Sequence, residues 1–241
     1  MKKVLLLSDI HANFPALKAV INSIKIDQFD LIINAGDLIV YGPFPNKSIK
    51  WCKNKKNVLS IKGNMEKRIL RLLKNGILKR PHSQEKKLMY YWTAEKLRKK
   101  YIEHLKKMPK TLSLNIENLS IGIFHGTAFK ANETLFPVSS SKERFGKLAE
   151  KFPFKIHIMG HSHVPYHKII NDIHFINPGS VGRMFDDNPA ASFAVLKISS
   201  KKISVKHFRV SYPVEKTINS LYENKFPSIF AKMFETGQKL N

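Results

Sequence analysis

Seven residues with metal-binding side chains occur along the sequence in five short motifs. The motifs are Asp9-Ile10-His11, Gly36-Asp37, Gly63-Asn64, His125-Gly126 and Gly160-His161-Ser162-His163. Carboxylate, amide and imidazole groups bind hard or borderline divalent ions through oxygen and nitrogen. Residues two apart in an extended chain point the same way, so Asp9 and His11 can address one point, as can His161 and His163. The pattern indicates a divalent metal site.

Each motif follows a segment that predicts a β-strand. The predicted strands are Val4–Ser8, Leu31–Asn34, Asn57–Ile61, Leu112–Ile116, Leu119–Phe124, Ile156–Met159, Ile173–Ile176, Ser192–Ile198 and Ile203–Val210. One predicted helix begins after Asn13. The other predicted helices cover Glu66–Lys74, Gln84–Lys107, Lys142–Phe152 and two short parts of Tyr212–Asn241. Helices alternate with strands first and strands dominate later, which indicates an α/β fold: a four-layer α-β-β-α sandwich of two mixed β-sheets flanked by helices. Ligands of such a sheet bind at the carboxyl ends of its strands.

Composition excludes several classes of protein. With 43% hydrophobic residues among 241, the chain is not mainly disordered. The single cysteine, Cys52, excludes an internal disulfide, and no apolar run is long enough to span a bilayer, so we expect a cytoplasmic protein that does not bind membranes. The net charge of +24 fits either a solvated lysine-rich surface or attraction to phosphate-rich partners.

The five motifs together resemble the calcineurin-like metallophosphoesterase superfamily, and most closely its small bacterial and archaeal phosphodiesterase branch. Two further stretches, Asn177 to Gly182 and Tyr41 to Asn46, also match that branch. The resemblance implies two divalent metal ions, with manganese the first choice and nickel, iron, cobalt or zinc the alternatives. It places one ion on Asp9, His11 and His163 and the other on Asn64, His125 and His161. Asp37 would bridge both.

The resemblance also implies a metal-dependent phosphoric ester hydrolase. A metal-bridging hydroxide would attack phosphorus, with Asp37, Asn64 and His125 in catalytic roles. Many members read G-N-H-D or G-N-H-E at the third motif, whereas this chain reads Gly63-Asn64-Met65-Glu66. Methionine cannot donate a proton, which favours phosphodiesters over monoesters. Glu66 either orients a metal ligand or faces solvent.

Two residues are candidates for contact with the substrate, which we expect to be a small phosphoester such as a nucleotide. Tyr41 either stacks on a base or packs its loop, and Arg183 either clamps a phosphate or lies on the surface. The basic stretch 86–107 interleaves lysines with aromatic residues, a pattern that fits a nucleic-acid strand or a solvated amphipathic helix.

Three other functions remain open at this point. They are a non-catalytic metal-binding scaffold on the same fold, a nuclease or nucleic-acid end-processing phosphodiesterase, and a phosphomonoesterase. We expect a metallophosphoesterase domain over residues 1–210 with a helical cap-like insertion at 65–110, and a docked helical tail at 211–241. Phe226, Phe230 and Phe234 in the tail either dock on the body or form a dimer seam, so the sequence fits a monomer or a homo-oligomer. We expect no metal role for the histidines at other positions, which are His82, His104, His157, His167, His174 and His207.

Overall fold

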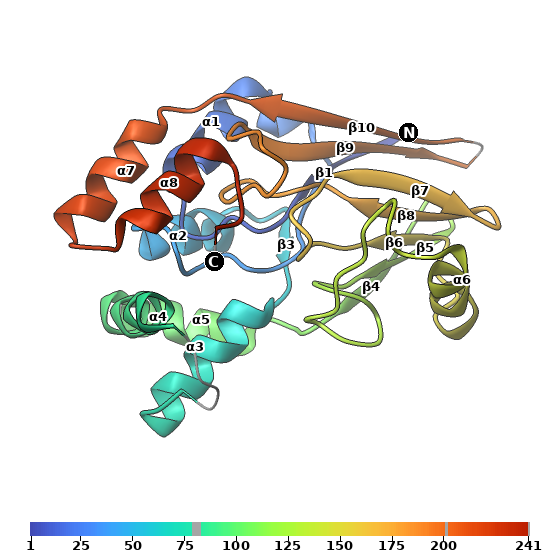
Figure 1. Ribbon diagram of the computed structural model, residues 1–241. Helices are drawn as coiled ribbons and strands as arrows, with labels where there is room; N and C mark the ends of the chain where they lie inside the picture. Colours follow the sequence, from blue (N-terminus) through green and yellow to red (C-terminus); the bar gives the residue numbers. More distant parts are fainter. Residues whose placement is uncertain (79–82, 201, 241) are drawn as a thin grey trace.

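Two five-stranded β-sheets are stacked face to face, with helices on both outer sides (Figure 1). The computed structural model describes residues 1–78, 83–200 and 202–240. Pro81, expected to separate two helices, and His82 lie outside the described residues. The four-layer sandwich predicted from the sequence is confirmed. In the described ranges, no helix is long and apolar enough to cross a membrane.

The first sheet has the strand order β10-β9-β1-β2-β3. Its strands are β1 (Lys2–Leu7), β2 (Leu31–Asn34), β3 (Val58–Ser60), β9 (Ala191–Ser199) and β10 (Lys202–Val210). The first three run parallel, and β9 pairs antiparallel with β1 and β10. The central strand β1 is covered on both faces, which explains why its predicted apolar run is continuous and not alternating.

The second sheet has the order β4-β5-β6-β8-β7. Its strands are β4 (Leu112–Ile116), β5 (Leu119–Ile123), β6 (Ile156–Ile158), β7 (Tyr166–Ile170) and β8 (Ile173–Asn177). The turn that joins β4 to β5 has Glu117 and Asn118 at φ of 50° and 64°, as a tight hairpin requires. Strand β7 is absent from the sequence prediction, because His167 and Lys168 interrupt its apolar pattern.

Apolar side chains fill three layers between these elements. Val4, Leu6 and Ile33 of the first sheet meet Ile121 and Ile158 of the second in one buried cluster. On the other face of the first sheet lie α1 (Phe14–Ser23), α2 (Pro45–Asn54), α7 (Val214–Glu223) and α8 (Ser228–Thr236). Helix α6 (Lys142–Lys151) covers the second sheet. The stack holds the strand ends of both sheets in fixed positions.

The predicted helix Gln84–Lys107 is wrong in one respect, because the chain forms two helices there. Helix α4 (Gln84–Lys96) ends at Leu97, and α5 (Lys99–Lys107) begins after extended Arg98. The side chain of Asn46 causes the break: it donates to the carbonyl of Lys96 and accepts from the N–H of Arg98. A contact 50 residues away in sequence thus overrides local helical preference. Helix α3 (Asn64–Asn75) precedes this pair and ends at Gly76.

The helical tail shares the core of the first sheet. Phe230 and Phe234 of α8 and Phe226 before it are buried among residues of α1 and β1. Asn13, which caps α1, also bonds to Tyr212 and Thr217 and so joins the tail to the first helix. These three phenylalanines therefore dock on the body of the same chain.

Candidate metal centre

The seven candidate ligands come from loops at the carboxyl ends of five strands. Asp9 and His11 follow β1, Asp37 follows β2, and Asn64 follows β3 as the first residue of α3. His125 follows β5, while His161 and His163 follow β6. The loops from the two sheets meet at one edge of the sandwich, so residues up to 154 positions apart share one site.

Five of these candidate ligands adopt a left-handed backbone. Asp9, His11, Asp37, His161 and His163 have φ values of 52°, 47°, 52°, 66° and 61°. Non-glycine residues rarely adopt this conformation, and its occurrence at several ligands indicates a functional constraint. Hydrogen bonds between loops hold it: Asp9 N donates to Gly36 O, His11 N to Asp37 O, and Gly160 N to His125 O.

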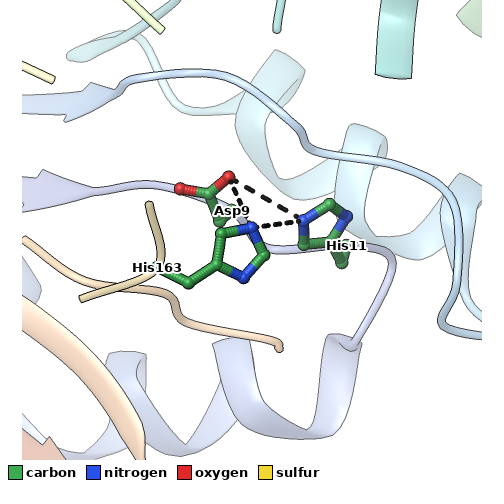
Figure 2. A group of neighbouring side chains, drawn as sticks. All are labelled: Asp9, His11 and His163. Carbon is green, nitrogen blue, oxygen red and sulfur yellow. Dashed lines mark hydrogen bonds and ion pairs between the residues drawn. The ribbon is translucent and has the colours of Figure 1, made fainter. Parts of the chain in front are cut away.

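Asp9, His11 and His163 form the first cluster (Figure 2). His11 Nε2 and His163 Nε2 are 3.2 Å apart, and Asp9 Oδ1 is 3.8 Å and 3.2 Å from them, respectively. All three side chains are buried. Two imidazole nitrogens and a carboxylate oxygen that converge in a buried place are a donor set for a divalent metal ion.

Asp37, His125 and His161 form the second cluster. His125 Nε2 lies 3.3 Å from Asp37 Oδ2 and 2.8 Å from Asn64 Oδ1, so Asn64 adjoins this cluster. Asp37 Oδ2 is also 3.8 Å from His11 Nε2 in the first cluster. Asp37 therefore belongs to the second cluster and presents the same oxygen to His11 of the first.

Hydrogen bonds outside the clusters orient their members. His125 Nδ1 donates to Ala35 O at 2.9 Å, and His163 Nδ1 donates to the backbone carbonyl of Arg183. Each bond places the ring proton on Nδ1 and leaves Nε2 to face the cluster, as metal-binding histidines require. Asp9 Oδ2 accepts from Ser8 Oγ and from the N–H of His161, which directs Oδ1 toward the first cluster.

The burial of the site changes the protonation of its groups. Burial lowers the pKa of His11 to about 3 and of His161 to about 4, so both rings are neutral at pH 7. Burial opposes protonation of His125, but the Asp37 carboxylate outweighs it and raises the pKa of that ring to about 9. Burial alone would raise the pKa of Asp9, yet the neighbouring imidazoles hold it well below its usual value. A metal ion would displace the proton from His125.

Glu66 is fully buried and braces the site, so the solvent-facing alternative is wrong. Its carboxylate accepts from the N–H groups of Gly63, Asp37, Leu38 and Ile39, at 2.7, 3.1, 2.8 and 3.2 Å. The Asp37 loop thereby joins the N-terminus of α3, where Asn64 lies. Burial and the nearby Asp37 carboxylate raise the pKa of Glu66 to about 7.

A cavity of about 260 Å³ opens over both clusters. Tyr41 and Arg183 line it, and the Arg183 guanidinium lies 3.8 Å from the centre of the Tyr41 ring. Both residues are buried, so Arg183 is not on the surface and Tyr41 has one face covered by that cation. Lys86 of α4 and Lys239 of the tail also line the cavity. Neither lysine belongs to a metal-binding motif: Lys86 begins the basic stretch 86–107, whereas no signal in the sequence identifies Lys239.

The remaining histidines of the described chain join no group of three metal-binding side chains. His157 is buried against the rings of Phe124, Phe154 and Phe175. His167 and His174 bond to each other on the outer pair of strands, β7 and β8. Cys52 is buried in α2 and belongs to neither cluster.

Comparison with known proteins gives a consistent result. Residues 1–201 match the calcineurin-like phosphoesterase superfamily domain. An uncharacterised protein of Methanocaldococcus jannaschii is 26% identical over 98% of both chains. The crystal structure of a metallophosphoesterase from Sphaerobacter thermophilus covers 98% of this chain and 99% of its own, with a TM-score of 0.81 and 22% identity. The crystal structure of a hypothetical protein from Pyrococcus horikoshii covers 99% of this chain and 100% of its own, with a TM-score of 0.88 and 21% identity.

Proposed function

This chain belongs to the calcineurin-like phosphoesterase superfamily, and we propose that it hydrolyses phosphodiesters with two divalent metal ions. The position of Asp37 carries the proposal. One oxygen of this buried carboxylate faces a donor cluster on either side, and both clusters line the same cavity. A carboxylate shared between two donor sets is suited to two adjacent cations.

The donor set fits such ions. Asp9, His11 and His163 would hold one, Asn64, His125 and His161 would hold the other, and Asp37 would contact both. Mixed nitrogen and oxygen donors suit manganese, iron, nickel, cobalt or zinc better than calcium or magnesium. Bound cations of this kind lower the pKa of water toward neutrality and neutralise charge on phosphoryl oxygens.

The cavity walls supply charge for an anionic substrate. Arg183, Lys86 and Lys239 all line the cavity that the two clusters share. Arg183 is buried and held by Tyr41 and by Met233, so its guanidinium is fixed in orientation before a substrate arrives. A cation fixed in this way positions a phosphoryl group without further ordering of its own side chain.

Met65 favours diesters over monoesters. Its N–H donates to Asp37 Oδ1 at 2.8 Å, and its side chain lines the cavity beside Asn64. A thioether offers neither a proton to a leaving group nor positive charge to a dianion. A diester carries one negative charge on its phosphate and depends less on that missing charge than a monoester does.

The test is hydrolysis of bis-4-nitrophenyl phosphate compared with 4-nitrophenyl phosphate. The protein is stripped of metal and resupplied with manganese, nickel, cobalt, zinc or magnesium in turn. We expect metal-dependent cleavage that is faster for the diester and lost in Asp37→Asn. The matched control is Asp27→Asn, which alters an exposed aspartate in a separate ion pair with Lys55. This variant should cleave both esters as the native protein does.

Three results would contradict the proposal. Monoester cleavage equal to or faster than diester cleavage would show that another group replaces the missing acid. Metal binding without any hydrolysis would favour a binding scaffold. Equal cleavage by Asp37→Asn and the native protein would place the activity elsewhere.

A further inference from the structure

A second cavity adjoins the metal centre at Asn64. It has a volume of about 440 Å³ and shares Asn64 with the candidate second metal cluster. Four cationic side chains line it, Lys67, Arg68 and Arg71 from α3 and Lys130 from the loop after β5. Leu72, Ile77 and Leu78 add an apolar part to its wall. The cavity is therefore both strongly basic and partly apolar.

The three cations of α3 form a row that starts at the metal ligand. Lys67, Arg68 and Arg71 are three, four and seven residues after Asn64, a spacing that places them on one face of the helix. An α-helix rises about 1.5 Å per residue, so Arg71 is about 10 Å along the axis from Asn64. Lys130 lines the same cavity from the loop after β5, so cations from two segments of the chain share this cavity.

No ion pair within the described part of the chain offsets these four charges. Arg68 instead donates to Tyr90 Oη, which fixes it against α4. Burial lowers the pKa of Lys67, and the neighbouring Lys110 lowers it further. An anion that contacts several of these cationic side chains reduces the repulsion between them, so the cluster favours the binding of an anion.

Since the metal centre would hold one phosphate, we propose that this cavity binds a second phosphate of the same substrate, and the proposal rests on the function proposed above. The separation along α3 suits two phosphates several bonds apart, as on the two ends of a sugar, better than the adjacent phosphates of a pyrophosphate. The apolar residues Leu72, Ile77 and Leu78 would contact an organic part of the substrate. The substrate class is a phosphodiester of nucleotide size that carries a second phosphate.

The described lining favours a compound of this size over a nucleic-acid strand. Among the described residues that line the basic cavity none is aromatic, so these residues offer no platform for stacked bases. The row of described cavity-lining cations along α3 ends at Arg71, before the helix ends at Asn75. This length suits one additional phosphate better than a longer strand.

The test compares the binding of thymidine 3′,5′-bisphosphate and thymidine 5′-monophosphate by calorimetry. The manganese-loaded protein, dialysed free of excess metal, is titrated at one fixed low salt concentration, because phosphate contacts weaken as salt rises. We expect the bisphosphate to bind at least about tenfold more tightly, the effect of one charge-assisted phosphate contact. In Arg71→Gln and in Lys130→Gln, this preference should fall below about threefold.

Matched controls remove equal charge elsewhere. Arg98→Gln alters an exposed arginine between α4 and α5, and Lys147→Gln alters an exposed lysine of α6. Both should keep the native preference. Equal affinity for the two thymidine phosphates, or a preference that survives both cavity substitutions, would overturn the proposal. A thymidine hexanucleotide bound over about tenfold more tightly than the bisphosphate would overturn the nucleotide-sized class.

The outcome is separable from that of the proposed function. Calorimetry reports affinity even if the protein hydrolyses neither nitrophenyl ester. A protein that prefers the bisphosphate through Arg71 yet cleaves no diester would lose the hydrolytic function and keep the second phosphate site. A protein that cleaves bis-4-nitrophenyl phosphate and shows no preference would keep the function and lose the site.

Discussion

Replacing Glu66 with glutamine tests whether this residue holds the metal loops together. One carboxylate oxygen accepts from Leu38 and Ile39, and the other accepts from Gly63 and Asp37. Glutamine keeps one oxygen acceptor but presents an NH₂ group in place of the other. Two buried backbone N–H groups would then face a donor instead of an acceptor.

The size of the effect follows from these contacts. A buried donor that loses its acceptor destabilises a protein by about 1–3 kcal/mol, so two such donors predict a loss of about 2–6 kcal/mol in the free energy of unfolding. For a chain of this size, each kcal/mol lowers the melting temperature by about 2–4 °C, which predicts a fall of about 4–24 °C. Because both loops carry candidate metal ligands, we also expect metal affinity to fall by about tenfold or more.

Urea unfolding followed by tryptophan fluorescence measures the first quantity, and metal titration of the folded variant measures the second. The matched control is Glu103→Gln, which alters an exposed glutamate paired with Lys106 and should change stability by no more than about 0.5 kcal/mol. A Glu66→Gln protein within about 1 kcal/mol of the native one would refute the bracing role. If the variant does not fold, Glu66→Asp keeps the charge and should retain part of the stability.

Three further predictions follow from burial and close contacts. Gly182→Ala would place a Cβ 1.8 Å from the carbonyl oxygen of Ile10 and should reduce stability by about 3 kcal/mol or more, whereas Gly146→Ala meets no atom within 4 Å and should gain up to about 1 kcal/mol in urea unfolding. Burial lowers the pKa of His157 to about 4 from 6.5, so the unfolded chain takes up this proton first and stability falls by up to about 3 kcal/mol as pH drops from 6.5 to 4. His157→Phe should remove that part of the pH dependence, and parallel curves for both proteins would count against it. Burial raises the pKa of the Cys52 thiol to about 12, so alkylation at pH 8 should be about a thousandfold slower in the folded protein than in urea, and equal rates would exclude the buried placement.

The sequence allowed prediction of the fold class and of where chemistry could occur. Buried strands such as β1 have continuous apolar runs, and each metal-binding motif follows a strand, so strand ends and motifs could be found together. Residue types alone indicate a donor set for divalent metal. Whether these residues are the ligands stays a prediction, because a set of facing donors shows only that a metal would fit.

What could not be predicted depends on contacts between distant segments. The break between α4 and α5 comes from the side chain of Asn46. The loop after β2, which contains Leu38, covers Glu66 and donates N–H groups to its carboxylate. Lys239 reaches the cavity only because α8 docks on the body of the chain. None of these effects leaves a periodic or compositional signal in its own segment.

The left-handed candidate ligands explain why the candidate metal centre depends on the whole sandwich. A non-glycine residue in a sparsely populated conformation costs of order 1–3 kcal/mol, and the five residues are spread over the loops after β1, β2 and β6, so these loops would not keep this conformation in isolation. Here each loop is fixed by its neighbours: Asp9 O accepts from Gly182 N, and Asp9 N donates to Gly36 O. The two sheets bring these loops together, so the strain is offset by hydrogen bonds between elements far apart in sequence. The donor clusters are therefore formed by the folded chain itself, and a metal ion would bind to groups already in position.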